Sequence, residues 1–414
     1  MGPRLTTMTT LSSQVQQCLE TNILPYWINK VQDPEGGFYG RVDGHDNVHP
    51  DAERGAVLNA RILWAFAAAY RVLHKSEYLA AAENAYRYVT SHFIDPDFGG
   101  VFWSVNSNGK ALDPKKQTYA IGFTIYGLSE YARATGSKES LAKAAQLFRD
   151  IEAHAFDKKH NGYIEALTRD WEPIADMRLS DKDENGSRTM NTHLHILEPY
   201  TNLLRAAREL GDDSLAQEVA PRVRNLIGIF VGPLLNFNTA HLDLFFDDEW
   251  KGKRNIESYG HDIEASWLLH EALLVLGGKE LTKKLEPTVR NIAHAADEGL
   301  QPDGSMIYEH WKDTGRYDRQ RQWWVECECV IGHVNLYQHF GDKDALHIAE
   351  RCWQYIDKNL VDHENGEWHW AVLPDGTLNL DDDKAGFWKC PYHNTRMCLE
   401  LIERLGDRCW VLMV

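Results

Sequence analysis

Asp95-Pro-Asp-Phe-Gly-Gly-Val-Phe-Trp103 is one copy of a short segment, rich in glycine and aromatic residues after an acidic start, that recurs along the chain. Related copies are Asp33-Pro-Glu-Gly-Gly-Phe-Tyr39, Asp157-Lys-Lys-His-Asn-Gly-Tyr163, Pro302-Asp-Gly-Ser-Met-Ile-Tyr308 and His363-Glu-Asn-Gly-Glu-Trp-His-Trp370. Their marker glycines, at positions 36, 99, 162, 304 and 366, are separated by 63, 63, 142 and 62 residues. The long gap is about two periods, and residues 238–246 lie near its middle as a degenerate sixth copy. The spacing therefore predicts six repeated units.

Two stretches with the apolar spacing of an amphipathic helix lie between consecutive turns. Residues 59–73 and 78–89, for example, carry apolar side chains at i, i+3, i+4 and i+7. Equivalent pairs are 118–135 and 139–154, 190–210 and 214–231, 260–277 and 280–296, and 322–340 and 344–359, with 11–30 and 387–405 at the ends. We therefore expect an all-α protein, an (α/α)6 barrel of about twelve helices with short β-hairpins at one rim. A linear solenoid is the alternative, but two-helix units favour a closed ring, which leaves no exposed end to cap.

No linker or low-complexity stretch interrupts this pattern. We expect residues 11–414 to form a single domain and residues 1–10 to be a disordered or tag-like end. The first residues contain no apolar run of the kind that a signal peptide or a membrane span needs. Seven cysteines without a C-x-x-C pair are typical of reduced, intracellular thiols. These features predict a cytoplasmic protein.

The composition is that of a soluble globular protein, with 43% hydrophobic and 25% charged residues. A formal net charge of −17 argues against nucleic acid or an anionic membrane as a partner, because both would repel the chain. An uncharged polar ligand fits better. A monomer and a homodimer are both compatible with these observations.

Ring closure would turn polar residues in the first turns of the inner helices toward a central cavity. His393 follows Pro391, which is tolerated in a first helical turn, and has Trp388 and Arg396 as neighbours. A single histidine is often structural, but these neighbours favour a role in proton transfer. Trp388 would suit stacking on a sugar ring.

His261 precedes Glu264 by three residues, so a helix would place both on one face. The pair could be a surface contact, or the carboxylate could orient the imidazole as a general base requires. Asn191 and His195, four apart, also share a face, whereas His193 points elsewhere and is expected to pack or to act as support. No complete ligand set accompanies these histidines, so we expect no metal and no cofactor.

Arg61 lies inside an apolar run, where a charge is costly unless it is paired or faces a cavity. It could stabilise a developing oxyanion, and a buried salt bridge is the alternative. Trp324, or its neighbour Trp323, is a second candidate for sugar stacking. Glu326 and Glu328 could be the acid/base pair of a glycoside hydrolase, but residues two apart on a helix point to different sides.

Several of these segments together resemble the cellobiose 2-epimerase family, part of the N-acylglucosamine 2-epimerase superfamily. They are Asn59-Ala-Arg-Ile-Leu-Trp64, Met190-Asn-Thr-His-Leu-His-Ile-Leu-Glu198, Gly260-His-Asp-Ile-Glu264, Trp323-Trp324 with Glu326, and Phe387-Trp-Lys-Cys-Pro-Tyr-His-Asn394. The resemblance extends from residue 14 to residue 405, with the motifs in matching order, and agrees with the barrel inferred from the repeats.

The resemblance implies a reversible inversion at C2 of the reducing-end glucose of β-1,4-linked disaccharides, from cellobiose to glucosyl-mannose and from lactose to epilactose. After ring opening, one histidine would remove the C2 proton, a cis-enediolate would form, and a second histidine would return a proton to the opposite face. It implies His261 and His393 as this pair, Arg61 as the oxyanion stabiliser and His195 as a group for ring opening or O1 contact. The residues expected to bind substrate are Asn191, Glu264, Trp324, Trp388, Tyr119 and Glu326.

Three alternatives remain open at this point. A monosaccharide 2-epimerase or aldose–ketose isomerase of the same superfamily would share both histidines. A glycoside hydrolase would need a facing pair of carboxylates. A non-catalytic sugar-binding protein on the same scaffold would bind without exchanging the C2 proton.

Overall fold

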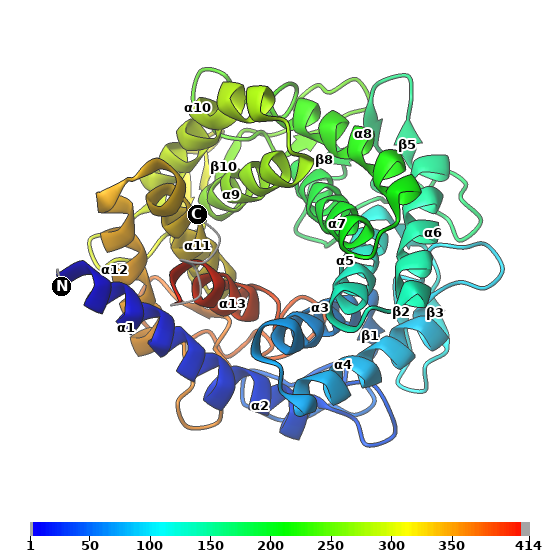
Figure 1. Cartoon of the computed structure of the whole chain (residues 1–414), viewed down its shortest axis with the longest axis horizontal. Coiled ribbons are helices and arrows are strands. Elements are labelled where there is room, and N and C mark those ends of the chain that lie inside the picture. Colours follow the sequence, from blue (N-terminus) through cyan, green and yellow to red (C-terminus); the bar gives the residue numbers. More distant parts are fainter. Residues whose placement is uncertain (1–2, 407–414) are drawn as a thin grey trace.

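The helices of the computed structural model, which describes residues 3–406, close into a double ring (Figure 1). The inner ring consists of α3 (Ala56–Leu73), α5 (Thr118–Thr135), α7 (Met190–Glu209), α9 (Tyr259–Leu276), α11 (Trp323–Phe340) and α13 (His393–Leu405). The outer ring consists of α1 (Pro3–Cys18), α4 (Ser76–Tyr88), α6 (Lys138–His154), α8 (Asp213–Phe230), α10 (Lys279–Ala296) and α12 (Lys343–Asn359). Each inner helix contacts the next, and α13 contacts α3. The predicted (α/α)6 barrel is confirmed.

All six predicted repeat turns form, each closed by an antiparallel bridge. The bridges are Gln32–Phe38, Ile94–Val101, Phe156–Tyr163, Leu235–Leu242, Leu300–Met306 and Val361–Trp368. In every turn the residue two places before the second bridge residue has a positive φ. Glycine fills this position in four turns, whereas Asn161 (φ 54°) and Ala240 (φ 63°) fill it in the others. The degenerate fourth copy is therefore a true turn in which Ala240 takes the place of the glycine. In the third turn Asn161 has the positive φ, so the marker Gly162 lies one residue after that position.

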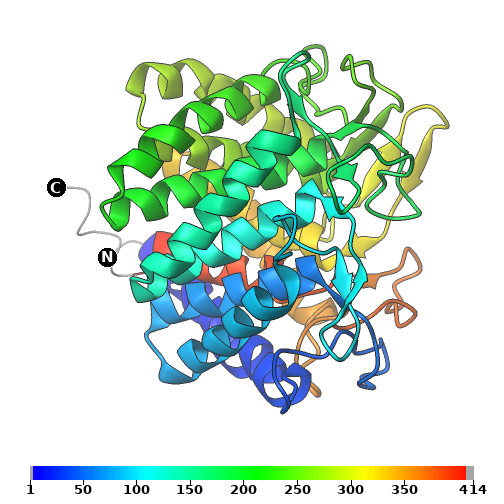
Figure 2. The ribbon, with the colours of Figure 1, turned by 90° about the vertical axis from the view of Figure 1, so that its right-hand side faces the viewer.

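Short strands lead into the inner helices. β1 (Arg54–Gly55), β4 (Lys116–Gln117), β8 (Arg188–Thr189), β10 (Ile256–Ser258) and β13 (Arg321–Gln322) directly precede α3, α5, α7, α9 and α11. These strands belong to small sheets of two or three strands. The other strands of these sheets are β2 (Ser104–Val105), β3 (Ala111–Asp113), β7 (Ala166–Leu167), β9 (Phe245–Phe246), β11 (Glu309–Trp311), β12 (Arg316–Asp318) and β14 (Ala371–Val372). A separate two-stranded sheet consists of β5 (Phe156–Asp157) and β6 (Gly162–Tyr163). The strands gather at one end of the barrel (Figure 2). The inner helices begin at this end, so the positive ends of their dipoles face one rim.

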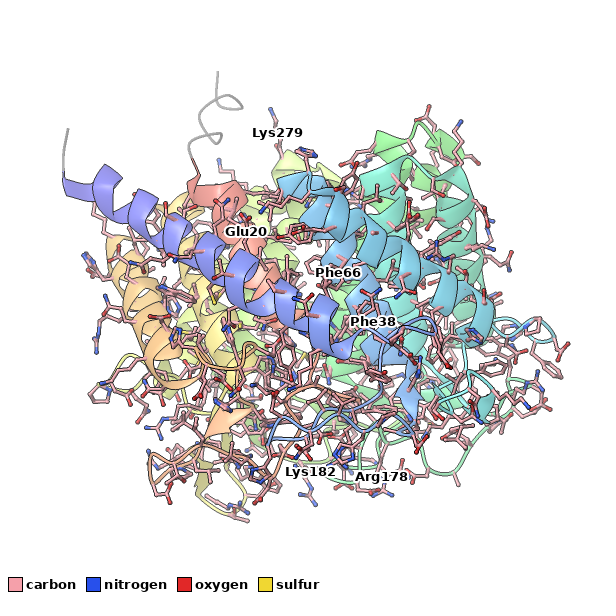
Figure 3. The ribbon with its side chains drawn as sticks, turned by 90° about the horizontal axis from the view of Figure 1, so that it is seen from below. Glu20, Phe38, Phe66, Arg178, Lys182 and Lys279 are labelled. Carbon is pink, nitrogen blue, oxygen red and sulfur yellow. The ribbon has the colours of Figure 1, made fainter. Side chains whose placement is uncertain are left out.

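The opposite end carries the tight connections from inner to outer helices. His74, Gly136, Gly277 and Gly341 follow α3, α5, α9 and α11 in the left-handed conformation and end those helices. Figure 3 shows Lys279, the first residue of α10, at this end, and Arg178 and Lys182 at the strand-bearing end. The two ends therefore differ in their connections, which are tight at this end and long at the strand-bearing end.

α3 is long and apolar enough to cross a membrane, but 78% of it is buried inside the barrel. Such a helix is apolar on all sides because neighbours cover it on all sides. One of its residues, Phe66, stacks on Phe38 of the first repeat turn with ring centroids 6.0 Å apart (Figure 3). The first turn is thereby fixed to the inner ring.

The chain enters the barrel along the outer helix α1. This helix continues through η1 (Leu19–Ile23), α2 (Leu24–Tyr26) and η2 (Trp27–Val31), which agrees with the helix predicted for residues 11–30. The backbone of residues 3–10 belongs to α1, whereas residues 1–2 and the side chains of residues 3–10 lie outside the described part. The expected tag-like character of residues 1–10 stays a prediction.

Candidate active site

Two of the predicted histidines lie against one tryptophan. The imidazole of His261, in the first turn of α9, is 4.7 Å from the indole of Trp324 between ring centroids, and that of His393, at the start of α13, is 5.6 Å from it. Gly260 permits this approach, because a Cβ there would lie 2.8 Å from the Trp324 ring. Residues from three inner helices thus meet at the strand-bearing rim.

The two imidazoles have different partners. His393 donates from Nδ1 to Glu328 Oε1 at 2.7 Å, whereas His261 Nδ1 lies 2.8 Å from the hydroxyl oxygen of Ser258. No hydrogen bond to Nε2 of either ring comes from the described residues, so this nitrogen is available to a substrate. A carboxylate partner fixes an imidazole and stabilises its protonated form, which a hydroxyl does less well. Neither interpretation of the His261–Glu264 pair holds, since Ser258 orients His261 and Glu264 is buried rather than at the surface.

Glu264 instead belongs to a buried charge cluster around Arg396. The guanidinium of Arg396 bonds Glu198, Glu264 and Glu328, with the Glu264 contact at 2.7 Å. Burial and the Glu328 carboxylate raise the pKa of Glu264 well above its ordinary value. Although burial opposes it, Arg396 and His195 lower the pKa of Glu198 to about 2. Burial raises the pKa of Glu328 as well, so Glu198 is the carboxylate of the cluster that stays ionised beside Arg396.

His195 is placed by a local break in α7. Pro199 has no N–H to bond the carbonyl of His195, and His195 adopts φ −89° and ψ 17° within the helix. The freed carbonyl turns toward α5, where a Cβ on Gly122 would lie only 2.3 Å from its oxygen. The imidazole then bonds Glu198 Oε2 at 3.0 Å through Nδ1.

His193 has the supporting role that was predicted. Its Nδ1 donates to the carbonyl of Thr189 at 2.7 Å, and its Nε2 accepts from the backbone N–H of Tyr163 at 3.0 Å. Both ring nitrogens are therefore used within the protein, and His193 takes no part in the site.

Arg61 is a buried cation without a carboxylate partner among residues 3–406. It is 3% exposed, donates to the hydroxyl of Tyr119 at 2.7 Å, and has its guanidinium carbon 4.1 Å from the ring centroid of Phe123 and 4.5 Å from that of Tyr392. No ion pair joins it to any described acidic residue, so the alternative of a buried salt bridge is wrong. An unpaired buried charge is costly and is expected where an anion forms during a reaction.

Aromatic rings line the approach to these groups. Trp388 is half-buried, with its indole 6.1 Å from the ring of Tyr119 and 5.8 Å from that of Trp103. Tyr119 also meets the imidazole of His195 edge-on at 5.1 Å. On the other side, Tyr308 packs edge-on against Trp324 at 6.0 Å. Such ring faces suit the apolar faces of sugars.

A cavity of about 110 Å³ opens beside His261. Asn191 lines it, and its Oδ1 is buried without a partner among the described residues, so it is free to bind a ligand. The other lining groups include Glu165, Leu179, Asp183, Tyr308 and Glu309, none of which was predicted from the sequence. Burial raises the pKa of Glu309 to about 7 and that of Glu165 to about 8. Tyr308 ends the fifth repeat turn, which is the one sequence signal that could have pointed to it.

The profile of the N-acylglucosamine 2-epimerase (GlcNAc 2-epimerase) family matches residues 37–396. The chain belongs to this family. It is 55% identical to a cellobiose 2-epimerase of Bacteroides fragilis over 95% of this chain and 98% of the relative, and 39% identical to one of Ruminococcus albus over 95% and 99%. A solved structure of cellobiose 2-epimerase from Bacillus thermoamylovorans is 40% identical, has a TM-score of 0.90, and is matched over 95% of this chain and 99% of that one. As a family member, the protein is a carbohydrate epimerase or isomerase.

One predicted contact is wrong in this epimerase-family member. Glu326 accepts the backbone N–H of Met306 at 3.1 Å and the thiol of Cys352 at 3.1 Å, so it faces the outer helix α12. It cannot contact a substrate beside His393. Glu328, two residues further along α11, faces inward, and the two carboxylates therefore do not form a facing hydrolase pair.

Potential metal ligands also occur in the site. Oxygen or nitrogen atoms of Glu264, Glu328 and His393 lie within 4.8 Å of one another. However, the guanidinium of Arg396 bonds both carboxylates, so a positive charge already lies between them. These residues do not suit a metal ion.

Proposed function

We propose that this enzyme reversibly inverts C2 of the reducing-end glucose in β-1,4-linked disaccharides, converting cellobiose to glucosyl-mannose and lactose to epilactose. The observation that carries the proposal is the contact of His261 and His393 with one indole, Trp324. The relatives named cellobiose 2-epimerases, at 55% and 39% identity, support this substrate class. Trp388 and Trp324 would stack on the two sugar rings.

Ring opening comes first, because only the open form has an aldehyde that acidifies the C2 proton. His195 would contact O1 or transfer a proton between O1 and the ring oxygen. One imidazole Nε2 then takes the C2 proton, and the C–H electron pair moves to form the C1–C2 double bond of a cis-enediolate. The negative charge reaches O1, where Arg61 and the positive helix ends would stabilise it. The other imidazole, protonated beforehand by solvent, donates this proton to the opposite face of C2 while the C1–O1 double bond re-forms.

The protonation states suit the first proton transfer, which needs a neutral base. Burial lowers the pKa of His261 to about 3, so it is a neutral base at physiological pH. Burial, with Arg61 and Arg396 nearby, also lowers the pKa of His393. Negative charge developing on the sugar favours the protonated form of a neighbouring imidazole. Glu328, which accepts the Nδ1 hydrogen bond, would then hold the imidazolium at His393.

Product analysis tests the proposed reaction against its alternatives. The enzyme is incubated separately with cellobiose, lactose, mannose and glucose, and products are identified by NMR. We expect glucosyl-mannose and epilactose from the disaccharides, with far slower conversion of the monosaccharides. Fructose from mannose as the main product would instead indicate an aldose–ketose isomerase, free glucose from cellobiose a hydrolase, and unchanged sugars a binding protein.

We also propose a cytoplasmic location, which rests on the sequence alone: seven cysteines without a C-x-x-C pair. The net charge of −17 supports a neutral sugar as partner rather than nucleic acid or a membrane surface. The state of assembly, monomer or homodimer, is open to direct measurement by light scattering.

A further inference from the structure

A second cluster of metal-ligand side chains lies away from the cavity lining. His241, from the fourth repeat turn, is 2% exposed, and its Nε2 has no hydrogen-bond partner among the described residues. This nitrogen lies 3.7 Å from Glu257 Oε1 and 3.6 Å from Glu298 Oε2. All three atoms lie within 4.8 Å of one another. A buried, unpartnered ring nitrogen is therefore directed at two carboxylates.

The other nitrogen of the same ring fixes its orientation. Asp262 Oδ2 accepts a hydrogen bond from His241 Nδ1 at 2.6 Å, so Nδ1 carries the proton in the neutral ring. The lone pair of Nε2 would then face two carboxylate oxygens, which is unfavourable unless a positive charge lies between them. A carboxylate behind a histidine is the arrangement that orients metal-binding imidazoles and increases their basicity.

The separations distinguish a metal ion from a proton. Distances of 3.6 and 3.7 Å exceed those of good N–H···O hydrogen bonds, so a proton on Nε2 would make ion pairs with the two carboxylates but no good hydrogen bond. Two ligands of a tetrahedral zinc ion with bonds of about 2.0–2.1 Å lie about 3.4 Å apart. The two nitrogen–oxygen separations need only a small contraction to reach this value.

We propose that His241, Glu257 and Glu298 form a binding site for one divalent transition-metal ion, zinc being the best match. An imidazole nitrogen with two carboxylate oxygens is a zinc donor set, with a fourth position left for water. Glu298 is 60% exposed on η4 (Asp297–Gly299), which gives the ion a path from solvent. The bound ion would link the fourth repeat turn through His241, β10 through Glu257 and η4 through Glu298.

Two further groups act on Glu257. Lys312 Nζ lies 3.0 Å from Oε1, the same oxygen that faces His241, and is a competing cation. His310 Nδ1 lies 3.2 Å from the other oxygen and orients the carboxylate. Removing the ammonium should therefore strengthen metal binding, whereas removing a ligand should weaken it.

The proposed site is a neighbour of the catalytic groups but separate from them. Glu257 precedes Ser258, the partner of His261, and successive strand residues face opposite sides. Asp262 follows His261 in α9. The ion would therefore fix β10 and the start of α9 from the side that faces away from His261, without touching a substrate. Its existence does not depend on the proposed reaction.

The test is zinc binding by the full chain after treatment with a chelator, followed by calorimetry near neutral pH. We expect one zinc ion per chain, with binding weakened at least about tenfold in Glu298→Gln. The exposed Glu280→Gln on α10 carries the same charge change and should bind as the parent does. Lys312→Met should bind more tightly.

Glu298 and Lys312 are partly exposed, so these variants should fold even if a change at buried His241 does not. Nitrogen NMR of His241 provides a second readout, since a metal-bound Nε2 and a protonated Nε2 have different shifts. Absence of saturable binding, zinc binding unaffected by Glu298→Gln, or a His241 imidazolium that persists in excess zinc would each overturn the proposal.

Discussion

His393 donates from Nδ1 to Glu328 Oε1 at 2.7 Å, while Glu326, two residues earlier on the same helix, faces α12. Glu328→Gln keeps the shape but removes the charge that holds the imidazolium, so kcat should fall about 10²-fold with KM little changed. Glu326→Gln is the matched control and should retain kcat within about twofold. Initial rates with lactose measure both. Equal losses in the two variants would contradict this account of Glu328.

Each histidine can be tested separately through proton exchange. With His261→Ala or His393→Ala, epimerisation should fall at least about 10³-fold, because one face of C2 has lost its proton-transfer group. The remaining histidine should still exchange the C2 proton of one epimer in deuterated water, without inversion. Circular dichroism controls for folding. Epimerisation near the parental rate in either variant would remove that histidine from the mechanism.

Arg61 should serve catalysis rather than stability. Arg61→Met removes a buried cation that has no ion pair within the described part of the chain, so kcat/KM should fall about 10²–10³-fold while the melting temperature stays the same or rises. Arg54, equally buried but paired with Asp33, provides the comparison. Arg54→Met should cost about 3–5 kcal/mol of unfolding free energy because it leaves a carboxylate unpaired. A large loss of stability in Arg61→Met would indicate a structural role.

The pH profile of kcat/KM should lack an acidic limb at the ordinary pKa of histidine. Burial lowers the pKa of His261 to about 3 and that of His195 to about 4. A base must be neutral, and these rings stay neutral until the pH falls through their lowered pKa values, so activity should persist from pH 7 to about pH 5. Initial rates across this range, with stability checked at each pH, provide the measurement. A limb centred near pH 6.5 would show that these imidazoles titrate as exposed ones do.

The fold was predictable from the sequence because its repeats are local. Glycine marked the strained turn position in most copies, and the helical periodicity between them was strong. The weakest copy, at residues 238–246, is recognised by spacing alone, since Ala240 adopts the positive φ that glycine adopts elsewhere. Length and periodicity were sufficient to predict a six-unit ring.

The site was predictable in its members but less so in its pairings. His393 and Glu328 are 65 residues apart, and Arg396 and Glu198 are 198 apart, so these contacts arise only when the ring closes. Local spacing allowed Glu264 to be the partner of His261 or a surface contact, but Ser258 is the partner. Likewise, the inward face of α11 could not be chosen from the alternation of Glu326 and Glu328. The lining residues Leu179 and Asp183 lie in a loop without periodicity and gave no signal.

The most direct test of the central claim, that two histidines exchange a proton on opposite faces of C2, is to incubate the enzyme with cellobiose in deuterated water and to follow C2 by NMR. We predict deuterium at C2 of both cellobiose and glucosyl-mannose, with the glycosidic bond intact. Formation of the epimer with its C2 hydrogen fully retained from the substrate, or cleavage of the bond, would contradict it.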